Sequence, residues 1–307
     1  MDHREDFAMS EAPPAAVSAL LRDRIGDAVG GLPPATLKVL RFIEANPGLA
    51  VAGSAADLAR RMDLSDASVI RAVQALGFEG MGGLRRALAS ALEGQSPAAR
   101  MRRTLQDAGA DSGRAIDLAL DAHQEAFAAL RSGVARERLL MAAGVLGGAE
   151  RIVVFGIGPS ALLAGYAVTL LGRAGRRARA LDATGIGLAD QLMDLRTGDG
   201  VLLLAYGRAY REVTATIAEA RRLALPVVLV TDSPESGLAR MADVVVPAAR
   251  GRSGRVALHG ATLVVLEALV LGLAAIDRPR ALAALERLNE LRKAVSGARH
   301  AVGETGG

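Results

Sequence analysis

Five short apolar runs in the second half of the chain constrain its fold more than any other feature of the sequence. Helix-length segments separate these runs. Strands that are so uniformly apolar are typical of a parallel sheet covered by helices on both faces. The sequence therefore predicts a doubly wound α/β domain around a five-stranded parallel sheet. The predicted strands are residues 152–155, 178–181, 201–205, 227–230 and 244–246.

Residues 54–78 have the pattern of two short helices joined by a tight turn. Ser54 and Asp57 fit a capping box that begins the first helix. Asp63 is a residue type that tolerates the left-handed backbone of a turn, and Ser65 can cap the second helix. Apolar residues recur at helical spacing along one side of the second helix and predict a buried face. Its members are Val69, Ala72, Val73 and Leu76.

The opposite face of the second helix is expected to point outward, and its side chains suit the major groove of DNA. Arg71 can bind guanine through two hydrogen bonds, and Gln74 can bind adenine. An ordinary helical hairpin with a solvated polar face is the alternative, because a lone helix-turn-helix pattern is only moderately specific. Residues 1–95 carry 12 acidic and 10 basic residues, so net charge alone does not favour a nucleic-acid partner. The predicted DNA-binding residues are Ser65, Ala67, Ser68, Ile70, Arg71, Gln74, Arg85 and Arg86.

Composition excludes several classes of protein. The 307 residues fit two domains, and no cysteine is present, which excludes disulfides and thiol nucleophiles. The first residues lack the basic start and apolar run of a signal peptide. The most apolar stretch, residues 261–276, is interrupted by Glu267 and is shorter than the roughly 20 residues of a membrane-spanning helix. We expect a cytoplasmic protein with no membrane partner and a buried core helix at 261–276.

The loops that follow the predicted strands are expected to bind a ligand, because doubly wound sheets bind ligands beyond the carboxyl ends of their strands. Residues 156–160 follow the first strand, and their glycines let the backbone approach an anion at the start of a helix. Ala161 replaces the third glycine of the dinucleotide fingerprint, which argues against a nucleotide cofactor. His259 has two readings, a general acid or base or a structural residue, and no carboxylate stands beside it in sequence. The other histidines lack metal-ligand spacing, so we predict no catalytic residue, metal or cofactor.

Short motifs in both halves carry a resemblance to a known family. In the first half they are Ser54-x-x-Asp57-Leu58-Ala59, Leu64-Ser65-x-x-Ser68-Val69-x-Arg71, Leu76-Gly77-Phe78-x-Gly80 and Leu84-Arg85-Arg86-Ala87-Leu88. In the second half they are Phe155-Gly156-Ile157-Gly158-x-Ser160, Thr231-Asp232-Ser233, Leu238-Ala239 and Ala242-Asp243. With these motifs the chain resembles the RpiR/MurR-type bacterial transcriptional regulators, which join an N-terminal helix-turn-helix domain to a C-terminal SIS (sugar isomerase) domain. The resemblance implies a flavodoxin-like strand order, a SIS domain that dimerises and senses a phosphosugar, and operator bases read by Arg71 and its neighbours.

The loop after the third strand departs from the family pattern. The family commonly has Ser-x-Ser-Gly-x-Thr there, whereas this chain reads Ala205-Tyr206-Gly207-Arg208-Ala209-Tyr210. Arg208 offers a planar donor and the two tyrosines offer aromatic surface, so the loop suits an anion such as a carboxylate. The alternative is that both tyrosines pack on the next helix and Arg208 is solvated. The predicted ligand-binding residues are Gly156, Gly158, Ser160, Asp182, Tyr206, Arg208, Tyr210, Thr231 and His259.

The sequence thus predicts an all-α helix-turn-helix domain followed by an α/β domain. The resemblance implies a homo-oligomeric regulator, dimeric or tetrameric, whose SIS domain senses a small anionic effector and modulates binding to a palindromic double-stranded DNA operator. A sugar-phosphate isomerase and a regulator whose SIS domain only dimerises remain the alternatives. We expect a helix-turn-helix domain at 1–95, a linker at 96–111, the SIS domain at 112–300 and a tail at 301–307.

Overall fold

The computed structural model forms two compact units, each built around its own core. The first holds the residues up to 120 together with two later segments, 207–210 and 251–257. The second holds the remaining residues and contains the sheet. The residues that the structure describes are 33–93, 96–207 and 210–296.

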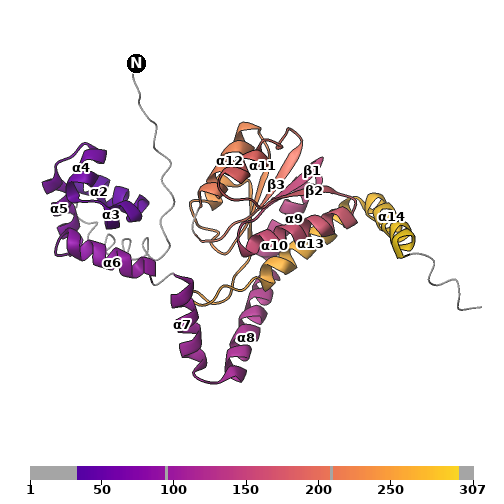
Figure 1. Ribbon diagram of the computed structural model, residues 1–307, viewed down its shortest axis with the longest axis horizontal. Helices are drawn as coiled ribbons and strands as arrows, with labels where there is room; N and C mark the ends of the chain where they lie inside the picture. The colour runs from indigo at the N-terminus through magenta and orange to yellow at the C-terminus, as the bar shows by residue number, and fades with distance from the viewer. Residues whose placement is uncertain (1–32, 94–95, 208–209, 297–307) are drawn as a thin grey trace, which may run out of the picture. The chain divides into compact units, whose positions relative to one another are not determined.

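The first unit contains the predicted helix-turn-helix motif, formed by α4 and α5 (Figure 1). The Asp57 backbone N–H donates to the Ser54 hydroxyl at 3.1 Å, and the Ser54 N–H donates to the Asp57 carboxylate at 2.9 Å, which confirms the capping box. Asp63 has φ 55° and ψ 52°, the predicted left-handed turn. Ser65 caps α5 as expected. The helices of this motif and its neighbours are α2 Pro34–Ala45, α3 Pro47–Ala52, α4 Ala55–Met62, α5 Asp66–Ala75 and α6 Met81–Glu93.

The predicted linker is largely helical. Most of residues 96–111 form α7, Pro97–Ala108, which Ser96 caps through a hydrogen bond from the Ala99 N–H. The next helix, α8, spans Ser112–Leu130, and the boundary between the two units lies within it. The domain limits expected from sequence therefore stay a prediction, whereas the helical character of this region is observed.

The second unit is a five-stranded parallel sheet in the order β2-β1-β3-β4-β5, which confirms the predicted fold and its flavodoxin-like order. The central strand β1 pairs with two neighbours, and Val154 is level with Ala180 on one side and Leu202 on the other. All five predicted strands are present, with ends shifted by one or two residues. They are β1 Arg151–Phe155, β2 Arg177–Leu181, β3 Asp199–Leu204, β4 Val227–Thr231 and β5 Val244–Pro247.

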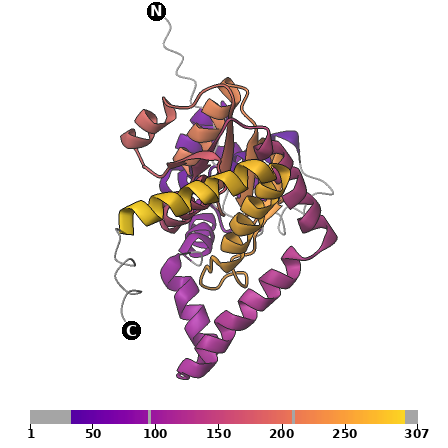
Figure 2. The same cartoon turned by 90° about the vertical axis from the view of Figure 1, so that its right-hand side faces the viewer.

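Helices cover both faces of the sheet (Figure 1). Successive side chains of a strand point to opposite faces, so Ile152 and Val154 join the core under α9, α10 and α13. Val153 and Phe155 join the core under α11 and α12. The last helix, α14, contacts α10 and α13 and runs on past them (Figure 2). These elements are α9 Gly133–Gly147, α10 Pro159–Arg173, α11 Ile186–Leu192, α12 Arg211–Arg222, the 3₁₀ turn η1 Ala239–Met241, α13 Gly260–Ile276 and α14 Arg278–Ser296.

The apolar stretch at 261–276 forms α13, and its inward residues are buried against the sheet, as predicted for a core helix. Among the described helices, none alone has the length and apolar character to cross a membrane, although α13 and α14, bent by 110° at their junction, meet that criterion as a pair.

An ion-pair network holds together the amino-terminal ends of the strands, at the opposite end of the sheet from the candidate ligand site. The Arg151 guanidinium, at the start of β1, donates two hydrogen bonds to Asp199, at 2.9 and 2.7 Å. It also donates to Asp194 at 2.6 Å. Hydrogen bonds from Arg151, then from Arg196 and Arg179, hold the pKa of Asp194 well below its usual range. The network joins the beginnings of β1 and β3 to the turn between α11 and β3.

Candidate functional site

The outward face of α5 gathers most of the side chains that the sequence assigns to DNA. Val69, Ala72 and Val73 are fully buried, and this fixes the rotation of the helix about its own axis. The opposite side chains consequently reach solvent, including the large apolar side chain of Ile70, which is 36% exposed. The structure brings together on this face Ser65, Ala67, Ser68, Ile70, Arg71 and Gln74.

A chain of hydrogen bonds orients Arg71 on this face. The Ser65 and Ser68 hydroxyls lie 2.9 Å apart, and the Ser68 N–H also donates to Ser65. Arg71 then donates from Nη2 to the Ser68 hydroxyl at 3.2 Å. This contact aligns the side chain along the helix toward its N-terminal end, which is the end that enters the major groove in helix-turn-helix proteins.

Arg85 and Arg86 do not share one environment. Arg85 is half-buried and donates to the backbone carbonyl of Gly53, so it ties α6 to the end of α3. Gly53 is required there, because a Cβ would lie 2.8 Å from the Leu49 carbonyl oxygen. Arg86 is exposed and lies 3.8 Å from the exposed Glu79 carboxylate. The structure therefore places Arg85 inside the domain, whereas Arg86 faces solvent.

At the carboxyl end of β1, the predicted loop turns tightly into α10. A Cβ on Gly156 would lie 2.3 Å from the Ser160 carbonyl oxygen, so only glycine fits. Gly158 precedes the helix with φ 58°, in the left-handed region. Ser160 is buried in the first turn of α10. The loop thus joins the carboxyl end of β1 to the first turn of α10, and its contact with an anion stays a prediction.

A polar cluster lies at the carboxyl ends of β3, β4 and β5, and its centre is Arg250. Arg250 donates from Nε to the Asp232 carboxylate at 2.9 Å, and its guanidinium lies 4.2 Å from the centre of the Tyr206 ring. The Tyr206 hydroxyl shares a 2.6 Å hydrogen bond with Thr262, and the ring meets His259 edge-on at 5.6 Å. Sequence reasoning missed Arg250. The signal available for it was an arginine placed four residues after the last predicted strand.

Burial determines the protonation of this cluster. It raises the pKa of Tyr206 to about 12, so the phenol stays neutral and keeps its proton. Burial, followed by the nearby Arg250 charge, lowers the pKa of His259 below its usual 6.5. The imidazole is therefore neutral at pH 7. Its Nδ1 atom is buried and has no hydrogen-bond partner within the described part of the chain.

The remaining predicted ligand residues take different positions. Thr231 is buried at the end of β4, where its hydroxyl accepts from the Ser233 N–H at 3.2 Å. Asp182 follows β2, and its carboxylate accepts from the Gln191 amide at 2.9 Å. Tyr210 is 51% exposed and belongs to the first unit, not to the sheet unit. Arg208 lies outside the described residues.

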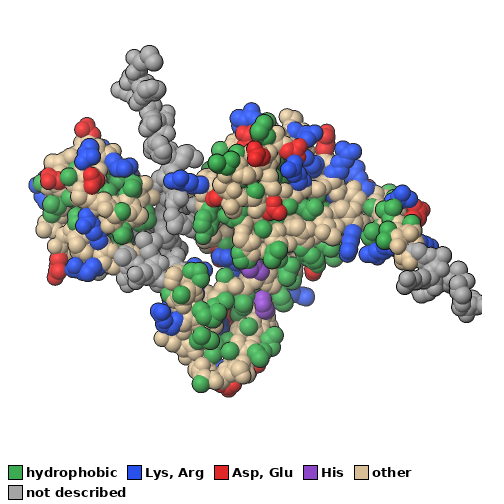
Figure 3. Space-filling view, viewed as in Figure 1, with side chains coloured by type: hydrophobic (Ala, Val, Ile, Leu, Met, Phe, Trp, Pro, Cys, Tyr) green, Lys and Arg blue, Asp and Glu red, His purple; other side chains and the backbone are tan. Residues whose placement is uncertain are grey.

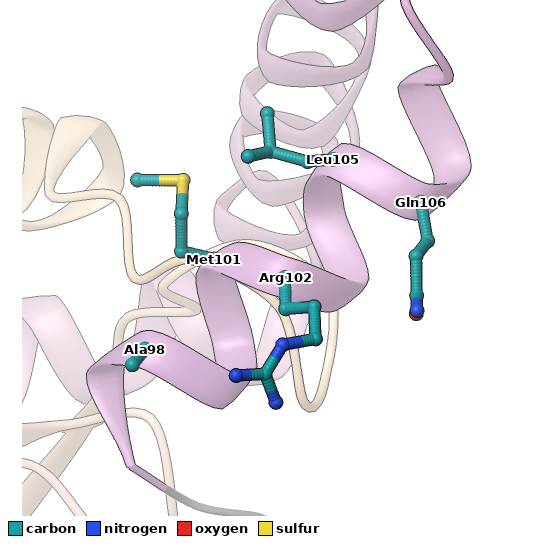
Figure 4. A pocket seen from close by; sticks show the side chains of 5 residues that line it. All are labelled: Ala98, Met101, Arg102, Leu105 and Gln106. Carbon is teal, nitrogen blue, oxygen red and sulfur yellow. The ribbon is translucent and has the colours of Figure 1, made fainter.

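An open groove on α7 is separate from the predicted sites. Figure 4 shows Met101 and Leu105 pointing to one side of the helix and Arg102 and Gln106 to the other; Ala98 completes the lining. Hydrophobic side chains also gather over α7 and the start of α8 in Figure 3. None of the residues predicted to bind DNA or a ligand lines this groove. The described residues hold no group of three or more acidic or histidine side chains that could bind a metal ion.

We predict that Arg85→Met weakens the packing of α3 against α6 by about 2 kcal/mol, because a charge-assisted hydrogen bond is lost and the Gly53 carbonyl loses its donor. Backbone amides in α3 and α6 should exchange with deuterium roughly 30-fold faster, since each 1.4 kcal/mol is tenfold. Arg86→Met is the matched control and should change exchange little, because exposed ion pairs contribute little. Equal protection in the two variants contradicts the structural position of Arg85.

Comparison with known proteins supplies two matches to family models. A model described as "Helix-turn-helix domain, rpiR family" matches residues 20–95, and a model of the SIS domain matches residues 146–276. The first match contains the described helix-turn-helix motif, and the second contains all five strands.

Two proteins are similar to this chain in sequence, and the similarity covers a different share of the chain in each case. An uncharacterized HTH-type transcriptional regulator, TTE0211, from Caldanaerobacter subterraneus subsp. tengcongensis is 26% identical over 211 residues, which cover 69% of this chain and 73% of the relative. The bifunctional protein glk of Paraburkholderia xenovorans is 29% identical over 163 residues, which cover 48% of this chain and only 25% of that protein.

The chain shares its fold with a solved structure of a regulator. The Vibrio vulnificus NanR protein, complexed with ManNAc-6P, matches with a TM-score of 0.50 and 24% identity, covering 89% of this chain and 97% of NanR. The sugar isomerase domain of an RpiR transcription factor from Sphaerobacter thermophilus matches with a TM-score of 0.47 and 24% identity, covering 63% of this chain and 94% of that domain.

Proposed function

Because the chain belongs to the RpiR-type helix-turn-helix regulators that carry a C-terminal SIS domain, we propose that it binds a DNA operator through α5 and that a small anionic metabolite modulates this binding from the sheet edge. The observation that carries the proposal is the exposed face of α5, with Arg71 held in place, in the same chain as a strand-end site centred on Arg250. A DNA-binding role also implies a cytoplasmic protein.

The DNA half of the proposal rests on the chemistry of the α5 face. Arg71 can bind guanine bidentately, Gln74 can bind adenine, and the exposed Ile70 can contact a thymine methyl. A single recognition helix buries little surface, so tight binding requires two helices at a fixed separation. Two such helices related by a twofold axis read a palindrome with half-sites about one helical turn apart.

The second unit supplies a surface for self-association. Leu162 on α10 is 79% exposed and Leu271 on α13 is 71% exposed, and a hydrogen bond of 2.7 Å from Tyr166 to Glu267 joins the same two helices. Large apolar side chains at this exposure on adjacent helices favour an interface between copies of the chain. A homodimer formed through this surface pairs two DNA-binding domains.

The proposed effector site lies at the carboxyl ends of the strands. NanR is complexed with ManNAc-6P, and we propose an effector of the same broad class here, a phosphosugar or a carbohydrate-derived acid. A sensing role is favoured over isomerisation. The match to the helix-turn-helix model and the regulator relative support this preference, because an isomerase has no use for a DNA-binding domain.

Arg71→Ala is expected to weaken binding to an operator selected from random DNA by about 1–3 kcal/mol and to relax sequence preference, because a bidentate base contact is lost. Gel-shift titration measures both effects. Arg240→Ala removes the same charge from an exposed position in the second unit and should leave affinity and preference nearly unchanged. If Arg71→Ala behaves like Arg240→Ala, α5 does not read the bases.

Leu162→Glu is expected to raise the dimer dissociation constant at least tenfold, because it places a charge in the proposed apolar interface. Sedimentation equilibrium of the full chain measures the change. Ile186→Glu, on the opposite helical layer and 87% exposed, is the control and should leave the dimer intact. A monomeric wild-type chain, or the same loss in both variants, rules out this interface.

A further inference from the structure

We propose that Arg250 is the residue that binds the charged group of the effector, and that the preferred group is a carboxylate. This inference rests on the proposed function, because it names the ligand class of the strand-end site. It differs from the sequence expectation, which assigned the anion to Arg208.

The surroundings of Arg250 leave one edge of its guanidinium open. Nε is taken by Asp232, and the Tyr206 ring covers one face of the group. Among the described residues, neither Nη atom donates a hydrogen bond to protein, and neither is among the buried atoms that lack a partner, so both reach solvent. Two parallel N–H groups on this edge match the two oxygens of a carboxylate.

The side chain is also held rigidly. Its exposed fraction is only 16%, and Asp232 and Tyr206 fix it from two directions. Tyr206 is itself held by its hydrogen bond to Thr262, which is fully buried. A fixed arginine loses little conformational entropy when a ligand binds, so its contact with an anion is favoured over that of a mobile surface arginine.

A carboxylate fits this site better than a phosphate ester because of the number of donors. A phosphate ester presents three acceptor oxygens. In the Ser-x-Ser-Gly-x-Thr loop of the family pattern, hydroxyl side chains can donate hydrogen bonds to these oxygens. Here Ala205 and Gly207 offer no side-chain donor, and the Tyr206 hydroxyl is already bonded to Thr262. The two Nη groups of Arg250 satisfy both oxygens of a carboxylate, whereas they leave part of a phosphate without partners.

Calorimetry tests the assignment with glucuronate, gluconate and glucose 6-phosphate as probes. Wild type is expected to bind at least one of the two sugar acids more tightly than glucose 6-phosphate. Arg250→Lys, which keeps the charge but loses the planar fork, should weaken that binding at least tenfold, and Arg240→Lys should not change it. Arg250→Gln serves as a second variant, and thermal melting of both shows whether they fold.

Three results overturn the proposal: tighter binding of glucose 6-phosphate, sugar-acid binding that survives both Arg250 variants, or no binding of either acid. The proposed function is tested separately by operator binding of the ligand-free wild type. The two ideas can therefore fail independently.

A second observation, independent of the ligand class, concerns the segment 251–257, which directly follows Arg250. The Leu258 N–H donates to the Arg250 carbonyl at 3.1 Å and closes the segment into a loop. Within the first unit this loop docks on α7. Arg255 holds the Asp107 carboxylate with both Nε and Nη2, the latter at 3.0 Å. We propose that this loop transmits the ligand state of the sheet edge to α7.

Two further contacts make the docking specific. Arg103 donates to the Gly254 carbonyl at 3.2 Å, and the Val256 N–H donates to the Thr104 hydroxyl at 3.0 Å. Gly254 has φ 73°, and a Cβ there would lie 2.7 Å from the Arg103 guanidinium. The loop is thus hydrogen-bonded to about one turn of α7, the helix that follows the DNA-binding domain in the chain. The seven residues 251–257 therefore join the backbone at Arg250 to residues that are hydrogen-bonded to α7.

Asp107→Asn is expected to reduce, by at least fivefold, the change in operator affinity that a saturating probe causes, whichever of glucuronate, gluconate or glucose 6-phosphate binds. Affinity for the probe and for DNA in its absence should remain within about twofold, since only the coupling between sites is lost. The exchanged pair Asp107→Arg with Arg255→Asp should restore the effect, and Asp117→Asn is the control. Unchanged coupling in Asp107→Asn overturns the proposal. The proposal is also overturned if the exchanged pair fails to restore the coupling. A wild type whose DNA affinity no probe changes contradicts the proposed function itself.

Discussion

Burial of both faces of the central strand β1 is the constraint from which the rest of the second unit follows. Ile152 and Val154 face one helical layer, and Val153 and Phe155 face the other. A strand without a wet face can exist only if helices cover both sides of the sheet. Parallel strands with crossover helices meet that condition, and they align the carboxyl ends of all five strands along one edge. The position of the candidate ligand site is a consequence of how the core is covered.

The same geometry explains why the polar cluster forms. Tyr206, Asp232 and Arg250 follow three different strands, and His259 begins the helix after the last of them. Tyr206, Asp232 and Arg250 are far from one another in sequence, yet adjacent parallel strands bring their ends within a few ångströms. The environment of the cluster then determines the protonation states of its side chains. Burial keeps the Tyr206 phenol and the His259 imidazole neutral, and Arg250, paired with Asp232, is the cation of the cluster.

Local signals gave the sequence-based predictions that the structure confirms. The capping box at Ser54, the left-handed Asp63 and the cap at Ser65 depend on neighbouring residues within one turn. The exposed face of α5 follows from helical periodicity, because burying Val69, Ala72 and Val73 leaves no other orientation. The five strands were visible as apolar runs, and the family matches cover the same segments.

The sequence by itself thus determined the two-domain plan, the strand set and the exposed face of α5, because caps, turns and periodic burial are properties of short segments. Only the tertiary structure decided which charged residues have a fixed role. Arg85 looks like a surface cation in sequence, but it binds a backbone carbonyl 32 residues away. Arg255 meets Asp107 across 148 residues, and Arg250 acquires its environment from separate strands. Pairing over such distances depends on how the elements pack, and no local pattern encodes it.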